Sequence, residues 1–389
     1  MCVTRFDALG LPGFTCSLAD GSPLAAALAS SSKQPRRRVE LSPLTWHDVA
    51  AGMMLVNGVM QTHVQGRATL ERGLLARARS TWMTQAPGLE LLFMTSCSEE
   101  GDRPPPKWWE AGQGLASTTA LPNVLWQCYR GQDTLGRSLW RKTGALLAML
   151  YERYPRKRFY LKIDSDTMVL PQALLRFLQA LHAGVRSRPL YFGSNRIASA
   201  THFGRGKGTL FASPIWKRLE KSLSEGGKHV AVGRHNATVA CESEESSYAQ
   251  GGAYGFSQSA LRALVGSSGS GSGGAGAGAS CLSSVAQAVG EHRNGRFVNL
   301  FEDEAVGLCM RLHRVRLITC GCFYDWGPCN IFDPHASCAA DTNASKICHL
   351  PLTVHKQRKL EWYDAWWKYL APREPAALAA LDAHLAGRA

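Results

Sequence analysis

The chain has 389 residues, of which 45% are hydrophobic and 19% charged, and its formal net charge is +14. This composition suits a globular protein with a large core, and the positive charge favours anionic or phosphorylated partners. Basic residues form only one dense run, at 33–38, and aromatic residues do not alternate with them, so we exclude nucleic acid as a partner.

Apolar strands and amphipathic helices alternate along residues 46–370, which we interpret as one domain. Strands are predicted at 53–60, 89–95, 124–129, 159–163, 189–193 and 297–301. Helices are predicted at 67–82, 135–154, 171–182, 257–265 and 362–367, with a further helix starting at 302. This alternation predicts an α/β fold with a mostly parallel sheet and helices on both of its faces.

Three segments lack such periodicity. Residues 1–45 are rich in Pro, Ser and Arg and are expected to be disordered or stem-like, residues 266–280 form a flexible Gly/Ser-rich insertion, and residues 371–389 form an Ala-rich tail. Residues 1–45 contain no run of 18 apolar residues, so no membrane anchor is visible there. We expect the chain to start downstream of an anchor.

Twelve cysteines are many for a cytosolic enzyme of this size. The spacing of Cys320 and Cys322 is not the paired C-x-x-C of a zinc site, so disulfides and an oxidising compartment are the better interpretation. Two N-glycosylation triplets, at Asn236 and Asn343, agree with that compartment.

Two aspartates, Asp164 and Asp166, follow the apolar strand at 159–163, and a helix begins at Pro171. Ligands collect at such strand ends in open α/β sheets. Two acidic groups one residue apart repel each other unless a cation lies between them, and carboxylate oxygens are hard ligands for divalent ions. The D-x-D pattern therefore indicates a metal that holds a diphosphate, although a surface turn with two solvated aspartates is an equal alternative.

Two later stretches carry further candidates. Glu302, Asp303 and Glu304 start a predicted helix, where negative charge is favourable, so capping alone explains them as well as chemistry does. His349 and His355 flank an apolar run, and an imidazole there completes a carboxylate metal site or serves as a structural hydrogen-bonding group.

Glycines 251 and 252 permit either a close backbone approach by a ligand or a tight turn before the helix that Ser257 caps.

Taken together in chain order, these stretches resemble the β1,3-galactosyltransferase and Fringe family of inverting glycosyltransferases, and most of all its core 1 galactosyltransferase branch. The resemblance covers about residues 50–370, and its fold is expected to be GT-A, a Rossmann-like nucleotide-sugar transferase fold. The matching stretches are RSTW (79–82), LLFMTSCSEEG, LWRKTGALLAML, FYLKIDSDTMV, YFG (191–193), YAQGGAYGFS, FEDEAVGLCM and LTVH (352–355).

The resemblance implies roles by position. Asp164, Asp166 and His355 would hold Mn²⁺, with Ser165 in place of the family's usual third acid, and Asp303 would be the catalytic base. Independently of the resemblance, Cys281 and Cys309 bracket the Glu-Asp stretch, and we expect a disulfide between them. The remaining implied substrate-binding positions are Arg79, Trp140, Lys142, Gly251, Gly252 and Glu302.

The implied reaction moves a hexose, galactose by this resemblance, from UDP-galactose to a sugar hydroxyl with inversion and in a β1,3 linkage. The expected acceptor is O-linked GalNAc on glycoproteins, or another glycan, in the Golgi or secretory lumen, and a homodimer stays open as the assembly. Alternatives are a Fringe-like N-acetylglucosaminyltransferase, a non-catalytic chaperone or lectin-like relative, and a polyanion-binding protein. The presence of all three acids and His355 favours an enzyme over the non-catalytic relative.

Overall fold

The computed structural model describes residues 16–18, 43–55, 67–96, 123–129, 139–184, 189–197, 247–266, 281–282, 302–313, 315, 317–320, 323–324, 351–355, 357 and 359–379. The strand predicted at 297–301 and most of the 266–280 insertion lie outside these residues. Of the N-terminal segment expected to be disordered or stem-like, Cys16–Leu18 forms an edge strand, β1, of the main sheet.

The main sheet has eight strands in the order β1-β9-β7-β8-β5-β2-β3-β4. Parallel pairings join β5 to β2, β2 to β3, β3 to β4 and β7 to β9, whereas β8 runs antiparallel to β5 and β7, and β1 to β9. The fold-class prediction of a mixed, mostly parallel sheet in an α/β fold is therefore confirmed. The strands after β1 are β2 (Val49–Met54), β3 (Glu90–Ser96), β4 (Asn123–Tyr129), β5 (Phe159–Asp164), β7 (Tyr191–Ile197), β8 (Ser247–Ser257) and β9 (Leu317–Cys320).

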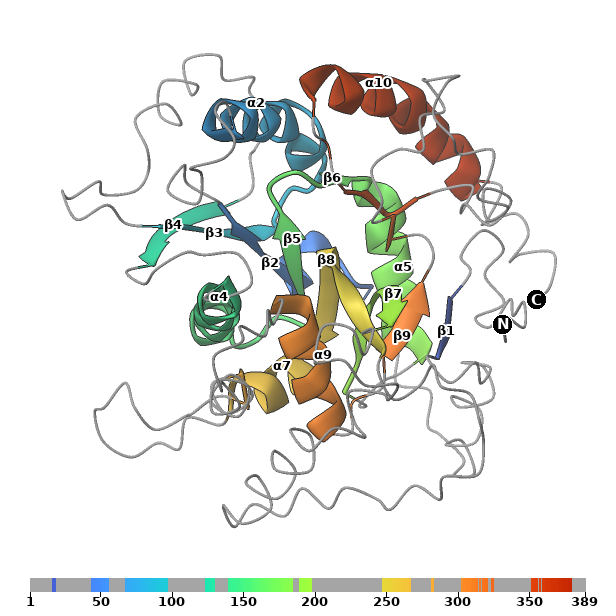
Figure 1. The fold of residues 1–389 in the computed structure, drawn as a ribbon. Helices are drawn as coiled ribbons and strands as arrows, with labels where there is room; N and C mark the ends of the chain where they lie inside the picture. Colours follow the sequence, from blue (N-terminus) through green and yellow to red (C-terminus); the bar gives the residue numbers. More distant parts are fainter. Residues whose placement is uncertain are drawn as a thin grey trace, which may run out of the picture.

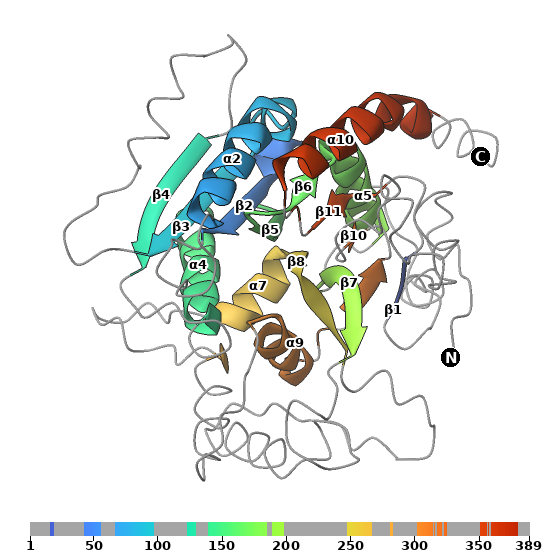
Figure 2. The same ribbon diagram turned by 45° about the horizontal axis from the view of Figure 1, so that its top comes forward.

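Helices cover both faces of this sheet (Figures 1 and 2). One face carries α2 (Arg67–Ser80), α5 (Pro171–Gly184) and α10 (Leu360–Leu370), and the other carries α4 (Leu139–Arg153), α7 (Gln258–Val265) and α9 (Glu302–Leu312). Short 3-10 helices lie at Trp46–Asp48 (η1), Trp82–Gln85 (η3) and Ala371–Arg373 (η9), and residues 374–379 of the predicted tail are helical. None of the described helices is both long and apolar enough to cross a membrane.

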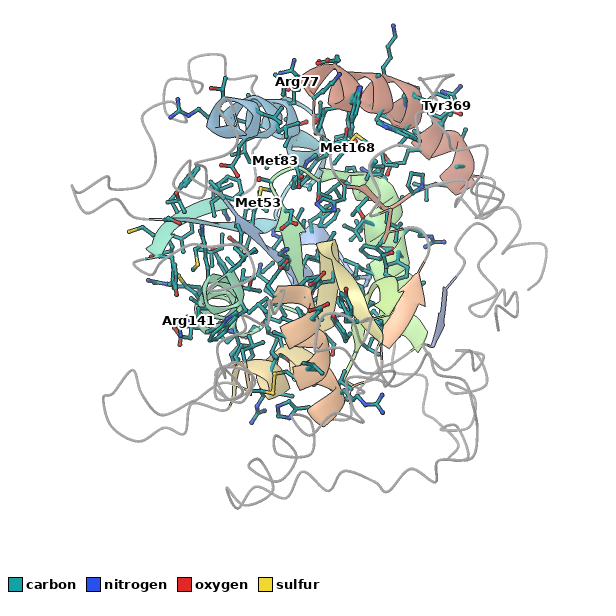
Figure 3. The ribbon with its side chains drawn as sticks, viewed as in Figure 1. Met53, Arg77, Met83, Arg141, Met168 and Tyr369 are labelled. Atoms are coloured by element: carbon teal, nitrogen blue, oxygen red, sulfur yellow. A yellow bond between two sulfur atoms is a disulfide. The ribbon has the colours of Figure 1, made fainter. Side chains whose placement is uncertain are left out.

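The side chains of β5 alternate between two hydrophobic clusters. Leu161 and Ile163 belong to the cluster under α2, α5 and α10, whereas Tyr160 belongs to the cluster under α4, α7 and α9. Figure 3 shows the side chains that fill the space between the sheet and the helices, with Met53, Met83 and Met168 among those on the α2 side. A strand buried on both faces explains why β5 reads as an almost continuous apolar run.

The first strand begins earlier than the sequence predicted. The prediction of 53–60 is wrong at its start, because β2 spans Val49–Met54, and residues 56–60 lie outside the described part of the chain. The small residues of β2, in the sequence VAAGMM, hide the strand pattern. A Cβ on Gly52 would lie 2.7 Å from Leu150 Cδ1, so this glycine lets α4 pack directly on the strand.

A second, small sheet has the order β10-β11-β6, with β10 at Phe323–Tyr324, β11 at Thr353–Val354 and β6 at Met168–Val169. Strand β11 runs antiparallel to β6, so Val354 faces Met168 across the pair. This pairing carries the late segment at 351–357 to the end of β5.

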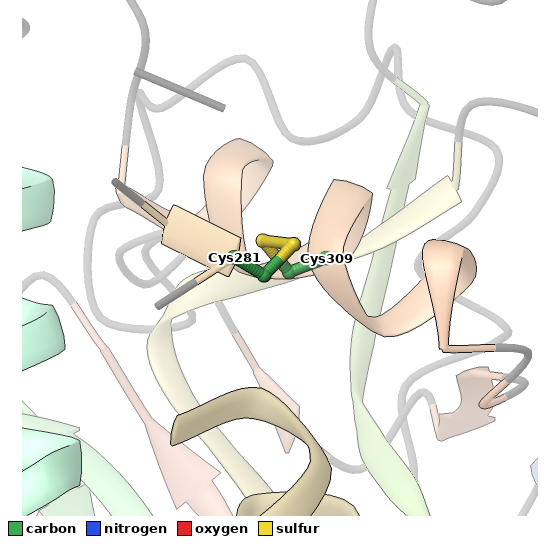
Figure 4. The surroundings of a disulfide bond; sticks show 2 residues. All are labelled: Cys281 and Cys309. Atoms are coloured by element: carbon green, nitrogen blue, oxygen red, sulfur yellow. A yellow bond between two sulfur atoms is a disulfide. The ribbon is translucent and has the colours of Figure 1, made fainter. Parts of the chain in front are cut away.

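The expected disulfide between Cys281 and Cys309 is present, and Figure 4 shows it beside α9. Cys309 is fully buried in α9, so the bond ties the short helical piece at 281–282 to this helix. Ser257 caps α7 as predicted, because its hydroxyl accepts a hydrogen bond from the Ala260 amide.

Candidate metal and transfer site

The D-x-D motif lies in a turn at the carboxyl end of β5. The Thr167 amide donates to the Asp164 carbonyl at 3.0 Å, which closes the turn, and the Thr167 hydroxyl donates to the carbonyl of Gly252 in β8 at 2.9 Å. Both aspartates are half-buried. The turn therefore presents two partly desolvated carboxylates at the edge where the neighbouring parallel strands β2 and β3 also end.

The small sheet brings His355 to these aspartates. The Gln357 amide donates to the Asp166 carbonyl at 3.0 Å, which fixes the chain directly after β11. His355 Nε2 lies 3.0 Å from Asp166 Oδ1 and 3.5 Å from Asp164 Oδ2. A histidine from a distant part of the sequence thus converges with the two neighbouring aspartates on one point.

These three residues fit a divalent cation. One ligand atom from each of Asp164, Asp166 and His355 lies within 4.8 Å of the others. Two carboxylates and one imidazole suit Mn²⁺ and similar ions and leave positions open for oxygens of a ligand. Burial, opposed by Lys162 and His355, raises the pKa of Asp164 to about 6, and Asp166 and Glu302 add to the rise. A cation at this point would stabilise the ionised form of Asp164.

Gly252 allows His355 to reach the site. A Cβ at position 252 would overlap the imidazole of His355, so the ring packs directly on the backbone of β8. Close approach is one of the two interpretations that the sequence left open, and here the approaching group is a side chain of the same protein.

We expect Gly252→Ala to weaken Mn²⁺ binding about 10–100-fold, the range for losing a group that orients a metal ligand. The matched control is Gly144→Ala in α4, whose new Cβ would meet the Leu282 side chain, 3.2 Å from its Cδ1 and 4.0 Å from its Cβ. Calorimetric titration with Mn²⁺ measures both variants. If Gly252→Ala bound Mn²⁺ as tightly as wild type, His355 would not be a metal ligand.

A buried lysine connects the metal aspartates to α9. Lys162 Nζ lies 2.5 Å from Asp164 Oδ1 and 3.1 Å from Glu302 Oε1, and its side chain is fully buried. Burial opposes its charge, but Asp164 and Glu302 together raise the pKa of Lys162 above its usual value, so the site holds an ammonium ion. Glu302 is the first residue of α9, as the sequence predicted.

Asp303 follows Glu302 in the first turn of α9 and is only 8% exposed. Its Oδ1 accepts a hydrogen bond from the Glu304 amide at 2.9 Å. Burial raises the pKa of Asp303 well above its usual range, and the charges of Glu302 and Glu304 add to the effect, whereas Lys162 and that amide lower it. Two buried tyrosines, Tyr191 of β7 and Tyr254 of β8, are also near enough to interact with Asp303 electrostatically.

Ser165, the middle residue of the D-x-D turn, has a partner on α2. Its hydroxyl donates to Glu71 Oε1 at 2.6 Å. A carboxylate at position 165 would therefore face the Glu71 carboxylate directly.

We expect Ser165→Asp to destabilise the metal-free protein by about 1–4 kcal/mol. The lower limit is the repulsion of two unit charges about 4 Å apart in water, and the upper limit is the same repulsion at an effective dielectric constant of about 20. Adding Glu71→Gln should restore most of the loss, because an amide can donate to the new carboxylate. Urea unfolding of the two single variants and the double variant measures this coupling. Simple additivity of the two changes would contradict it.

The other implied substrate positions lie on α2, α4 and β8. Lys142 of α4 is fully buried. Its Nζ donates to the Leu55 carbonyl, just past the end of β2, at 2.5 Å, and to Oγ of Ser96, the last residue of β3, at 3.0 Å. Trp140 is buried in the α4 cluster with the Arg141 guanidinium 5.0 Å from its ring centroid, and Arg79 is half-buried in the last turn of α2. Gly251 lies in β8 beside Gly252.

The sequence interpretation missed Lys162 and Glu71. A signal for Lys162 was present, because the period of two in a strand places Tyr160, Lys162 and Asp164 on one face of β5. A lysine in a buried strand, two residues before the candidate metal-binding Asp164, needs a counter-charge, and Glu302 provides one. No comparable pattern pointed to Glu71.

No family model matches the sequence, and no curated protein sequence matches it. Among solved structures, the chain is similar to the crystal structure of mouse xyloside xylosyltransferase 1 in its apo form. That likeness has a TM-score of 0.40 at 11% sequence identity and covers 79% of this chain and 97% of the other.

Proposed function

We propose that this protein is a metal-dependent inverting glycosyltransferase with a GT-A fold that uses a UDP-sugar donor. The observation that carries the proposal is the convergence of Asp164, Asp166 and His355 within 4.8 Å at the end of β5. The Lys162 bridge from Asp164 to the α9 residue next to Asp303 supports it. The order of the matching stretches along the sequence favours the β1,3-galactosyltransferase family.

In this proposal Asp164, Asp166 and His355 hold the divalent cation, which is Mn²⁺ by the family resemblance. When bound, it would supply Lewis-acid stabilisation for a leaving diphosphate. Asp303 takes the proton of the acceptor hydroxyl while the hydroxyl oxygen bonds to the anomeric carbon and the bond from that carbon to UDP breaks. Because its pKa is raised, the ionised Asp303 would be a stronger base than an ordinary aspartate.

The substrate assignment is part of the same proposal. The donor is UDP-galactose, and the acceptor is O-linked GalNAc on a glycoprotein, joined in a β1,3 linkage in the Golgi or secretory lumen. Glu302, Gly251, Gly252, Arg79, Trp140 and Lys142 are proposed to line or support the donor and acceptor sites. The buried disulfide between Cys281 and Cys309 suits an oxidising lumen.

The deciding experiment measures UDP release and product formation from a panel of UDP-sugars with an α-GalNAc peptide, with Mn²⁺ or with chelator. We expect turnover with UDP-galactose and Mn²⁺ only. Turnover with UDP-N-acetylglucosamine instead would indicate Fringe-like chemistry. Mn²⁺ binding without turnover on any acceptor would favour a non-catalytic relative, and salt-sensitive heparin binding that ignores Mn²⁺ would favour a polyanion-binding protein.

A further inference from the structure

Lys162 is buried in the middle of the main sheet. It faces Gly52 of β2 and Tyr254 of β8 in the strand register, and its Nζ lies 5.3 Å from the centroid of the Tyr254 ring. An ammonium ion in such a place is strongly destabilising unless it is paired and hydrogen-bonded. The chain therefore has a specific arrangement that keeps this charge here.

The two partners of Lys162 come from different elements. Asp164 belongs to the end of β5 and uses its Oδ1 for the lysine, while its Oδ2 lies toward His355, 3.5 Å from Nε2. Glu302 opens α9 and contributes Oε1 at 3.1 Å. The Lys162 ammonium group thus binds one oxygen of Asp164 and, at the same time, the first residue of α9.

The helix that Lys162 holds is also packed closely on the sheet. A Cβ on Gly307 would overlap Cβ of Tyr248 in β8, so α9 rests directly against that strand, as the ribbon views show. Its first turn carries Glu302, Asp303 and Glu304, all buried. Carboxylates at a helix start are stabilised by the helix dipole but repel one another, and Lys162 offsets that repulsion.

We propose that Lys162 is a positioning residue, which holds the first turn of α9, and with it Asp303, at a fixed place relative to the metal-binding carboxylates. This inference rests on the proposed function. In the proposed mechanism, Lys162 itself contacts neither the sugar nor the acceptor hydroxyl. It acts through Glu302, whose neighbour in the chain is the proposed base.

The test compares Lys162→Met with the control Lys157→Met. Lys157 lies away from the site and has similar partners, because its Nζ donates to the His47 carbonyl at 2.7 Å and to Glu90 Oε1 at 3.5 Å. With saturating Mn²⁺, we expect Lys162→Met to lower kcat about 10²-fold, as a displacement of 1 Å does, with little change in the donor KM. The acid limb of its pH profile should move to higher pH, because the lost cation favours protonated Asp303. Lys157→Met should match wild type in both.

A measurement without substrate tests the bridge itself. Amides of α9 should exchange hydrogen faster in Lys162→Met than in wild type or Lys157→Met. If Lys162→Met does not fold, Glu302→Met carries the exchange test, because it removes the helix end of the bridge and leaves Lys162 paired with Asp164. Unchanged exchange in α9, an unmoved pH limb, or a loss confined to the donor KM would each overturn the proposal. If wild type transfers no sugar at all, the proposed function fails, and the exchange data still decide whether Lys162 holds α9.

Discussion

Asp303→Asn should lower the transfer rate about 10²–10⁴-fold, the usual contribution of a positioned general base. Asparagine has nearly the same shape but cannot take a proton from the acceptor hydroxyl. Binding of UDP in the presence of Mn²⁺ should survive, because the proposed ligands Asp164, Asp166 and His355 are untouched. Initial-rate kinetics and calorimetry on the same preparation separate these two results.

The wild-type pH dependence gives the same assignment a second test. A base works only when it is deprotonated, and burial raises the pKa of Asp303 well above its usual range. The rate should therefore rise with pH beyond the range in which an ordinary aspartate has already lost its proton. Asp364→Asn is the control, since Asp364 lies exposed on α10 and pairs with Arg77 at 2.8 Å. Loss of UDP binding together with activity in Asp303→Asn would reject the base assignment.

The parts of this site that the sequence revealed are those with a local physical signature. The apolar run at 159–163 ending in Asp164, and Pro171 opening an amphipathic helix, predicted both β5 and α5. The acidic start of α9 at Glu302 was equally visible, because negative charge is favoured at a helix N-terminus.

The parts that the sequence hid depend on contacts between distant segments. The residues of β11 are too few to be recognised as a strand, and its pairing with β6 decides that His355 meets Asp166. The start of β2 was missed because Gly52 is a weak strand former, although the same glycine is what lets α4 pack there. In both cases tertiary packing outweighs local propensity.

Asp166→Ala should lose most of the metal-dependent UDP binding. Removing a group that only orients a ligand lowers metal affinity about 10–100-fold, so removing one of three protein ligands should have at least that effect. Asp364→Ala removes an exposed aspartate of α10 and serves as the matched control. Calorimetric titration of Mn²⁺, followed by UDP, measures the loss, and wild-type UDP binding that ignores chelator would contradict a metal role for these acids.

Thermal unfolding distinguishes a lost ligand from a damaged fold. In the metal-free protein, Asp166→Ala removes a repulsion with Asp164 but also the contact with His355 Nε2 at 3.0 Å. These two effects oppose each other, so the melting temperature should stay nearly unchanged. Wild type should instead be stabilised by added Mn²⁺, by about 2.7 kcal/mol at a concentration of 100 times Kd. Only the variant without Asp166 should fail to respond, because the stabilisation comes from binding to a site that Asp164 and His355 alone do not complete.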